Sequence, residues 1–307
     1  MFEAQQLVFY TCVSPVHMGA GQAVGAIDNP IQREVHTSHP LIAGSGLKGA
    51  VRHHFTQTWK DANDKALIER LFGPERNASE HAGAIAFTDA ALVAFPVRSL
   101  KNTFVYATCP TALARLKRLA GAAAKWGVPA VAEGEAKAAG DAAFSNGRLV
   151  LEAFDFAATA DAGVTAIAAW LATNALPQGA EHEYFRAKLK TDLVVLSDTE
   201  FGHFVRHATV VEAHVRIDND TGTAADGALF YTENLPPEAL LAGLLLASVE
   251  RRKGKDPEGL MDANEVLAAV LRDAGERKGL ADHLLQVGGD ATTGRGLIVV
   301  HPAGEGA

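Results

Sequence analysis

The stretch from His17 to Arg52 places the strongest constraint on what this chain can fold into. Two glycine-rich segments enclose the acidic residue Asp28, and the second segment runs directly into a predicted helix that carries Lys48 and Arg52. Glycines leave backbone N–H groups accessible, and a helix N-terminus adds a positive partial charge. Combined with two cations, this pattern is suited to holding phosphate. A carboxylate beside such a site is placed to act on the phosphate as well as to lie near it.

Short strands and helices are predicted along the chain without a regular βα repeat. The first strand covers 7–13, and a long loop separates it from a helix over 46–59, which Ser45 is predicted to cap. The end of the chain is predicted to be a glycine loop followed by a strand. This irregular order favours an α+β fold over a doubly wound sheet. Residues 84–97 are predicted to form a strand, a turn and a second strand, 148–156 a strand, and 193–196 a short buried run. Further helices are predicted at 65–71, 111–124, 161–175 and 266–279.

Two regions have a less regular pattern. Residues 120–148 are rich in alanine and glycine and are predicted to be a loop or an insertion. Residues 205–217 resemble one arm of a hairpin, because turn signals follow at 219–222 and a short return strand is predicted at 228–231. We therefore expect a hairpin late in the chain.

Composition argues against a membrane-spanning protein. The chain has 307 residues, of which 48% are apolar, so it can form a sizeable core. The longest apolar run, 239–249, is shorter than the roughly 20 residues that a membrane helix needs, and is predicted to be a buried helix. The N-terminus does not resemble a signal peptide. Only Cys12 and Cys109 are present, which argues against a disulfide framework and fits the reducing cytoplasm.

Charge is unevenly distributed along the chain. The net charge of −8 taken alone argues against a nucleic-acid partner. However, residues 91–132 contain six Lys and Arg residues and no acid, while acids gather at 133–161 and 256–265. This segregation predicts one basic face on an acidic protein. The alternative is that the same charges scatter over a solvated surface. The six cations are Arg98, Lys101, Arg115, Lys117, Arg118 and Lys125.

Three motifs considered together resemble one known family. They are IDNPIQRE at 27–34, GSGLKGAVR at 44–52 and GGDATTGRGL at 288–297. The chain resembles the RAMP superfamily of CRISPR proteins, and within it the backbone subunit of Cmr-type (type III-B) effector complexes. The resemblance extends over essentially the whole chain. It departs from the family in the first glycine loop, where Met18, Ala20 and Gln22 interrupt the glycines.

The resemblance implies both a fold and a set of partners. The implied fold is a single domain over 1–307 with an RRM-like (ferredoxin-like) palm, a helical insertion at about 100–190 and a thumb β-hairpin at about 197–232. Several copies would stack along a CRISPR guide RNA, together with other subunits of the Cmr-type complex. Each copy would cleave the paired target RNA once, with a divalent metal ion, Mg²⁺ or Mn²⁺.

The resemblance also implies which residues carry the chemistry. Asp28 matches the family's key aspartate and would hold the metal while the 2′-hydroxyl of the RNA attacks its own phosphate. His17 is a candidate general acid or base, since an ordinary imidazole has a pKa of about 6.5. Tyr231 and Glu233 are predicted to approach the same scissile phosphate from a neighbouring copy. Each of the four residues also has a plainer interpretation. Asp28, followed by Asn29 and a proline, would be a turn residue, and His17 a polar loop residue. Tyr231 would be a packed tyrosine and Glu233 a surface glutamate.

A second set of positions is predicted to contact RNA. Cations on the first helix and in the Asp28 loop would bind phosphate, and the terminal glycine loop would present its amides to the guide. Alternatively, the helix cations lie on a solvated helix edge, the residues of the Asp28 loop are simply exposed at the surface, and the terminal glycines form a tight turn. The predicted RNA-binding residues are Gln32, Arg33, Ser45, Lys48, Arg52, Gly294 and Arg295.

Two other functions are open from the sequence. A catalytically inert guide-binding subunit would have the same fold and the same basic loops, so only the role of Asp28 separates it from a nuclease. The segment 44–49 also matches the pattern G-x-G-x-x-G of dinucleotide-binding oxidoreductases. That pattern follows a central strand in a βαβ unit, whereas Pro40 makes the preceding segment a poor central strand. The oxidoreductase is therefore a remote alternative.

Overall fold

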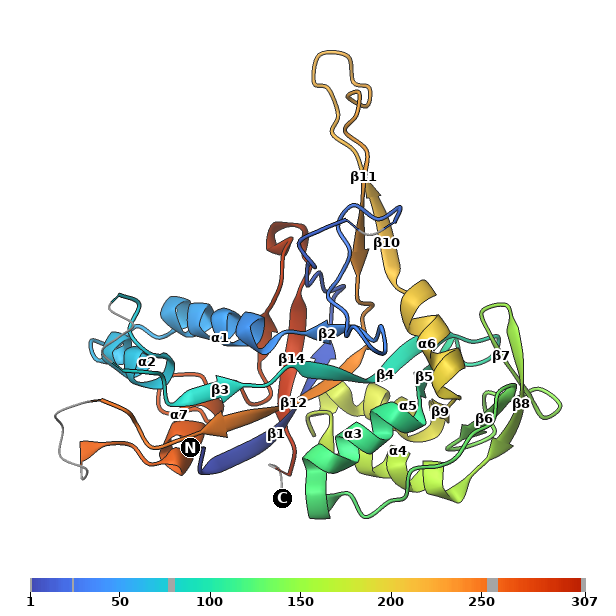
Figure 1. The fold of residues 1–307 in the computed structure, drawn as a ribbon, viewed down its shortest axis with the longest axis horizontal. Coiled ribbons are helices and arrows are strands. Elements are labelled where there is room, and N and C mark those ends of the chain that lie inside the picture. The colour runs from blue at the N-terminus through green and yellow to red at the C-terminus, as the bar shows by residue number, and fades with distance from the viewer. Residues whose placement is uncertain (1, 24, 77–80, 253–258, 305–307) are drawn as a thin grey trace.

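The computed structural model describes residues 2–23, 25–76, 81–252 and 259–304 (Figure 1). Its fold is mixed α+β, as predicted, and is built on one large sheet that contains both parallel and antiparallel strand pairs. Within the described residues this sheet has 12 strands, and two more strands form a separate hairpin. No helix in the described ranges has the length and apolar character needed to cross a bilayer.

The strands are β1 (Ala4–Cys12), β2 (Leu41–Ile42), β3 (Ile85–Phe87), β4 (Ala90–Arg98), β5 (Phe104–Thr108), β6 (Glu135–Ala138), β7 (Arg148–Leu151), β8 (Phe154–Ala160), β9 (Leu193–Val195), β10 (Val210–His214), β11 (Phe230–Asn234), β12 (Leu240–Ala247), β13 (Leu284–Gln286) and β14 (Leu297–Pro302). The α-helices are α1 (Gly44–Thr58), α2 (Asp64–Phe72), α3 (Pro110–Ala120), α4 (Ala162–Asn174), α5 (Glu183–Asp192), α6 (Asp198–His207) and α7 (Ala263–Leu271). Short 3₁₀ helices occur at Gly121–Ala123, Ala180–His182 and Ala291–Thr293.

Four central strands lie in the order β14-β1-β12-β4, and each neighbouring pair is antiparallel. Along the chain, α1 lies between β1 and β4, and α7 lies between β12 and β14. Each helix therefore links two strands that have a third strand between them. The centre of β1 is paired on both edges, with the Cα atom of Val8 opposite Gly243 on one side and Pro302 on the other.

Side chains alternate along β1 and enter two cores on opposite faces of the sheet. Val8, Tyr10 and Cys12 pack in the first core, whereas Leu7 and Phe9 pack in the second. This is the period of two expected of a strand that is covered on both faces. The strand predicted at 7–13 is therefore confirmed, and its burial on both faces fixes its register.

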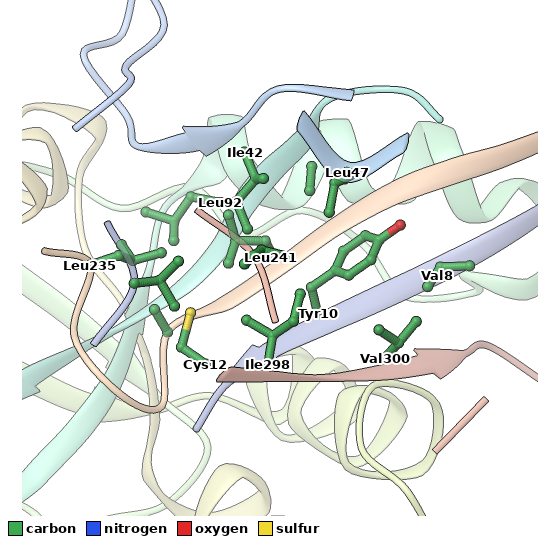
Figure 2. Packing of buried hydrophobic residues seen from close by; sticks show 14 of the residues in the cluster. Val8, Tyr10, Cys12, Ile42, Leu47, Leu92, Leu235, Leu241, Ile298 and Val300 are labelled. Atoms are coloured by element: carbon green, nitrogen blue, oxygen red, sulfur yellow. The ribbon is translucent and has the colours of Figure 1, made fainter. Parts of the chain in front are cut away.

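Helices cover both faces of the sheet. The apolar stripe of α1, formed by Leu47, Val51 and Phe55, is buried in the first core, while α3 and α4 contribute to the second. Figure 2 shows side chains from β1, β12, β14 and α1 converging in the first core. Spacing of the stripe at i, i+4 and i+8 explains why this segment forms a helix against a sheet.

The prediction of a buried helix at 239–249 is wrong. These residues form β12, which lies between β1 and β4. Most of its side chains are buried on both faces, so the run is apolar at nearly every position and shows no alternation. A short apolar run of this kind does not by itself distinguish a buried strand from a buried helix.

The sheet continues from β4 into a second half with the order β5-β9-β6-β8-β7. Strand β6 pairs with both β8 and β9, although the segment 120–148 was predicted to be a loop. Helices α4 and α5 pack on this half of the sheet, whereas α3 contacts β4 and β12. The predicted boundaries of an insertion at 100–190 and of one domain over 1–307 stay predictions.

A long hairpin rises from the sheet (Figure 1). Its base is formed by β10 and β11, which pair antiparallel from Val210 opposite Asn234 to His214 opposite Phe230. The predicted hairpin is therefore confirmed, but its first arm is shorter than the 205–217 expected, because residues up to His207 belong to α6. Beyond the base, Ile217 and Leu229 are exposed. The hairpin is thus the most prominent projection from the fold.

Candidate active site and nucleic-acid interface

The loop that carries Asp28 lies against the hairpin strand β11. Asn29 and Thr232 form a parallel β-bridge. The N–H of Asn29 donates to the carbonyl of Tyr231 at 3.0 Å, and the N–H of Glu233 donates to the carbonyl of Asn29 at 2.9 Å. The loop is therefore joined to the hairpin by a single β-bridge, and its register is set by β11.

The Asp28 carboxylate is fixed by this arrangement and is still accessible. Its Oδ2 atom accepts a hydrogen bond of 2.8 Å from the main-chain N–H of Tyr231. The residue is exposed, and it lines a pocket of about 340 Å³. His17 and the first glycine loop, including Gly19 and Gly21, line the same pocket. A carboxylate that is held in place beside an open pocket is suited to act on a bound phosphate.

His17 joins three segments that are far apart in the sequence. Its Nδ1 atom lies 2.7 Å from the carbonyl oxygen of Glu233. Because a carbonyl only accepts, Nδ1 carries the proton, and a neutral ring then has Nε2 as its acceptor. The carbonyl of His17 accepts from the N–H of Gly289 at 2.9 Å. A Cβ atom at Gly288 would overlap that carbonyl, so this position requires glycine.

Nε2 of His17 faces the first glycine loop. A Cβ atom built at Gly19 would lie 3.1 Å from Nε2, so the backbone of this loop packs closely over the ring. The ring also lies against Gly289, at 3.4 Å from the position of its Cβ. The structure thus places His17 in the predicted site, where it packs between two glycine loops and the hairpin.

The positions of Arg33 and Glu233 do not support the predicted contacts with RNA. The two side chains form an ion pair at 2.5 Å, and the Glu233 side chain is only 3% exposed. A glutamate buried in its own chain is not available to approach a phosphate bound to a neighbouring copy. Tyr231, by contrast, is exposed at 39%, so its side chain is accessible, and its approach to a phosphate stays a prediction.

Gln32 spans the two glycine-rich segments. Its Nε2 atom donates to the carbonyl of Gly19 at 3.1 Å, and its Oε1 atom accepts from the N–H of Ala43 at 3.3 Å. The side chain therefore links the pocket loop to the residue that precedes α1. Both ends of the amide are engaged, which makes Gln32 a connector within the chain as well as a predicted RNA contact.

The terminal glycine loop is tied to the hairpin by a second arginine. Arg295 donates from Nη2 to both carboxylate oxygens of Glu212, at 2.7 and 2.6 Å. Gly294 has φ +80°, which favours glycine. Sequence reasoning missed Glu212, because no local pattern relates it to a loop 83 residues away. Arg295 would reach RNA only if it left this pair or shared its donors.

Ser45 does not cap α1 as predicted. The helix begins one residue earlier, at Gly44, whose N–H donates to Oδ1 of Asp89 at 2.7 Å. Ser45 is exposed in the first turn. The carboxylate of Asp89, which sequence reasoning missed, therefore occupies one donor of the helix N-terminus that was expected to bind phosphate. A Cβ atom at Gly44 would overlap the carbonyl of Phe87, so close packing explains this glycine.

The same helix excludes the oxidoreductase alternative. The strand before the glycine motif, β2, has two residues and pairs antiparallel with β4. A dinucleotide-binding unit needs a parallel βαβ crossover with the motif at the carboxyl end of its first strand. Of the three glycines in 44–49, only Gly44 is closely packed, and all three belong to α1 and do not form a cofactor loop.

Lys48 and Arg52 lie along α1 and not in the Asp28 pocket. Arg52 lines a separate pocket of about 430 Å³ between α1 and α2, and its Nη2 atom lies 3.8 Å from Glu75. Burial lowers the pKa of Lys48, and the nearby charges of Arg52 and Arg251 lower it further. Lys48, Arg52 and Arg251 lie near one another, and although Glu75 partly balances Arg52, such a group of cations is suited to an anionic partner.

The basic segment at 91–132 does not form a uniform basic face. The fold brings acids from elsewhere in the chain to its cations, as when Arg98 pairs with Glu152 at 2.9 Å and Arg115 pairs with Glu34 at 2.6 Å. Arg118 is exposed. Charge that is segregated along the sequence is thus partly neutralised in the folded chain.

Asp28 does not belong to a preformed metal cage. Among the residues that the structure describes, no group of three or more His, Cys, Asp or Glu side chains is arranged to hold a metal ion. Mg²⁺ is commonly bound by one or two carboxylates together with waters and substrate phosphates. Asp28 therefore fits such an ion only as one ligand of a site that bound RNA would complete.

Comparison with known proteins supports the resemblance. A family model described as the RAMP superfamily matches residues 9–299. The CRISPR system Cmr endoribonuclease Cmr4 of Pyrococcus furiosus is 33% identical over 300 residues, which is 96% of this chain and 94% of that protein. The crystal structure of oligomeric Cmr4 from Pyrococcus furiosus has a TM-score of 0.70 at 27% identity, with 97% of each chain covered.

A more distant structure shares the fold. A chain of the type III-B Cmr-beta complex bound to cognate target RNA has a TM-score of 0.71 at 19% identity, with 98% of both chains covered. Similarity at this identity concerns the fold alone. The family match and the relative that is 33% identical both extend over nearly the whole sequence. This chain therefore belongs to the RAMP superfamily.

Proposed function

We propose that this chain is a backbone subunit of a type III-B CRISPR effector complex, in which it binds guide RNA and cleaves the paired target RNA. Two similarities support this assignment. The relative that is 33% identical is a Cmr endoribonuclease, and the solved relative at 27% identity is an oligomer of Cmr4. The proposed partners are guide RNA, target RNA, further copies of this chain and other Cmr subunits.

The finer description of the fold is part of the proposal. The elements β1, α1, β4, β12, α7 and β14 follow the order βαββαβ, and their strands have the order β14-β1-β12-β4. This order supports a ferredoxin-like palm. The projecting hairpin of β10 and β11 is then the thumb, and the half of the sheet that contains β5 to β9 is the insertion.

One observation carries the nuclease assignment. The Asp28 carboxylate is exposed in a pocket, and a main-chain hydrogen bond from the hairpin holds it there. A carboxylate that is both fixed and exposed beside a pocket is available to a ligand bound there. The glycines around the pocket leave room for an RNA backbone to approach closely.

The proposed reaction is an attack by the RNA on its own phosphate. The 2′-oxygen forms a bond to the adjacent phosphorus, and the bond from phosphorus to the 5′-oxygen of the next nucleotide breaks. The 2′-hydroxyl loses its proton, and the 5′-oxygen gains one. The products are a 2′,3′-cyclic phosphate and a 5′-hydroxyl, and no oxidant or further reactant is required.

Asp28 would contribute in two ways. Its carboxylate would accept the proton of the 2′-hydroxyl, and it would supply one oxygen ligand to a divalent ion, Mg²⁺ or Mn²⁺. When bound, the ion would offset the charge that develops on the phosphate. Nε2 of His17 is packed against Gly19, so we assign His17 to shaping the pocket rather than to proton transfer.

Replacement of Asp28 tests this function. Asp28→Asn keeps an oxygen that can accept from Tyr231 but removes the negative charge. We expect a reconstituted complex with this variant to assemble and bind target without cleaving it. Cleavage at the wild-type rate would instead support the inert guide-binding subunit.

A further inference from the structure

The side chain of Glu233 is the most heavily engaged polar group at the base of the hairpin. Its Oε2 atom accepts from the N–H of Ile31 at 3.1 Å, and its Oε1 atom accepts from Oγ1 of Thr209 at 2.8 Å and from Nη2 of Arg33 at 2.5 Å. All three partners are donors. A buried carboxylate with three donors, one of them the cation Arg33, is satisfied within the chain and has no need of RNA or metal.

Arg33 extends this network to a third element. Its Nη1 atom donates to the carbonyl of Ser38 and to the carbonyl of Val205, both at 2.8 Å. Val205 lies in the last turn of α6, just before β10. The guanidinium therefore connects the loop of Asp28, the end of α6 and the hairpin strand β11. A planar group with several fixed donors is suited to such a junction.

The network reaches Asp28 through the short bridge between the loop and β11. Glu233 holds Ile31 by its side chain and Asn29 by its main chain, and Tyr231 holds Asn29 and Asp28 in turn. A shift of one residue between these two segments would remove the donor that fixes Asp28.

We propose that the Arg33–Glu233 ion pair is a positioning device, which sets the register of the Asp28 loop against the hairpin and so fixes the Asp28 carboxylate. Neither residue contacts RNA or metal in this assignment. The effect on the loop follows from the contacts within the chain. Only the consequence for cleavage rests on the proposed function.

The first test needs neither RNA nor metal. Glu233→Gln replaces one acceptor oxygen by an amide NH₂, which must then face one of the three donors. Hydrogen exchange of the full-length chain, followed by mass spectrometry, reports on peptides that cover 27–34 and 228–235. We expect exchange of these peptides to rise by about tenfold or more in the variant.

Glu250→Gln is the matched control. Glu250 is also fully buried and pairs with two arginines, Arg70 and Arg252, but it has no contact with the Asp28 loop. The Glu250→Gln variant should leave both peptides, 27–34 and 228–235, at their wild-type exchange rates. Wild-type exchange in Glu233→Gln, or an equal rise in Glu250→Gln, would overturn the proposal.

The second test uses the assembled complex. Glu233→Gln should slow single-turnover cleavage at saturating target by about tenfold or more, with unchanged target affinity, because displaced reacting groups lose rate steeply. The metal concentration that gives half of the maximal rate should also rise. A merely structural defect would lower the fraction of active complex but leave the half-maximal metal concentration unchanged. An unchanged half-maximal metal concentration would therefore count against a positioning role.

A milder variant guards against misfolding. Thr209→Val removes one donor to Glu233 and leaves the ion pair, so its effects should lie between wild type and Glu233→Gln. If the exchange result holds but the wild-type complex does not cleave, the proposed function fails and the positioning device stands. If wild type cleaves and both variants match it, only the positioning role is refuted.

Discussion

The main-chain N–H of Tyr231 donates to Oδ2 of Asp28 at 2.8 Å, across 203 residues of sequence. The carboxylate is therefore positioned by the backbone of the hairpin and not by any side chain of it. The carbonyl of the same residue accepts from the N–H of Asn29. Both main-chain groups of Tyr231 face the Asp28 loop, so this residue has none to offer to β10.

This geometry separates the backbone of Tyr231 from its ring. Tyr231→Pro removes the donor to Asp28 but no hydrogen bond of the β10–β11 ladder, since proline is tolerated where a strand's N–H faces away from its partner. We expect it to slow cleavage by about tenfold or more. Tyr231→Ala keeps the N–H and should cleave within about threefold of wild type, if positioning is the main role of this residue.

Single-turnover cleavage by reconstituted complexes measures both variants, with target affinity recorded alongside. Equal losses in the two variants would show that the exposed ring itself takes part in the reaction. That outcome would restore the contact with the scissile phosphate that the sequence predicted for Tyr231.

The cations of α1 are predicted to bind guide phosphates. Replacing Lys48 and Arg52 together with alanine should weaken guide binding at low salt. It should also reduce the slope of log K against log[salt] by about 1.4, since each phosphate contact on a single strand contributes roughly 0.7. Binding titrations over a range of salt concentrations give the slope.

A double variant of equal charge change is the control. Arg148 and Lys190 lie outside both pockets, and their replacement by alanine removes the same two charges. This control should keep the wild-type slope. If both double variants lower the slope equally, the effect comes from net charge and not from contacts of α1.

The central strand β12 should dominate stability. Leu241 is fully buried in the first core, beside β1 and β4 (Figure 2). Leu241→Ala should lower the free energy of unfolding by about 3 kcal/mol, from lost transfer free energy and the cavity left behind. Denaturant titration of the isolated chain measures this. A loss below about 1 kcal/mol would show that the core is less closely packed than described.

His39 should make stability depend on pH. Burial lowers the pKa of His39 from its ordinary value, because it disfavours the charged ring. The folded chain therefore binds the proton less readily than the unfolded chain. The stability that this group contributes is fully present above about pH 6.5 and is lost as the pH falls below that value through the lower pKa of the folded state.

The test compares the free energy of unfolding between pH 7.5 and pH 5 in wild type and in His39→Phe. A phenyl ring retains the edge contact with Phe201 and does not titrate. The decrease in stability on acidification should be smaller in the variant. An identical decrease would mean that other groups account for the acid sensitivity.

Local patterns in the sequence predicted part of this fold correctly. The α1 stripe of Leu47, Val51 and Phe55 predicted a helix against a sheet, and β1 was predicted from its composition. The error at β12 has a physical cause, since complete burial removes the alternation that marks a strand. Helix α6 was missed, although Ser197 caps it and Glu200 lies three residues later, a known sign of a helix start.

The site was predicted in its residues but not in its contacts. Motifs identified Asp28, His17 and the glycine loops, and the structure places them around one pocket. The partners of Arg33 and Arg295 are glutamates of the hairpin, and no local rule relates residues so distant in sequence. An arginine in a loop was therefore predicted to bind phosphate, when its charge is already balanced within the chain.

The most direct test of the account is the rate of target cleavage by complexes that contain Asp28→Asn. With assembly, guide content and target affinity at wild-type levels, we expect the single-turnover rate at saturating metal to fall by about 10³-fold or more. A complex that carries this substitution and still cuts bound target at the wild-type rate would contradict the assignment of this carboxylate.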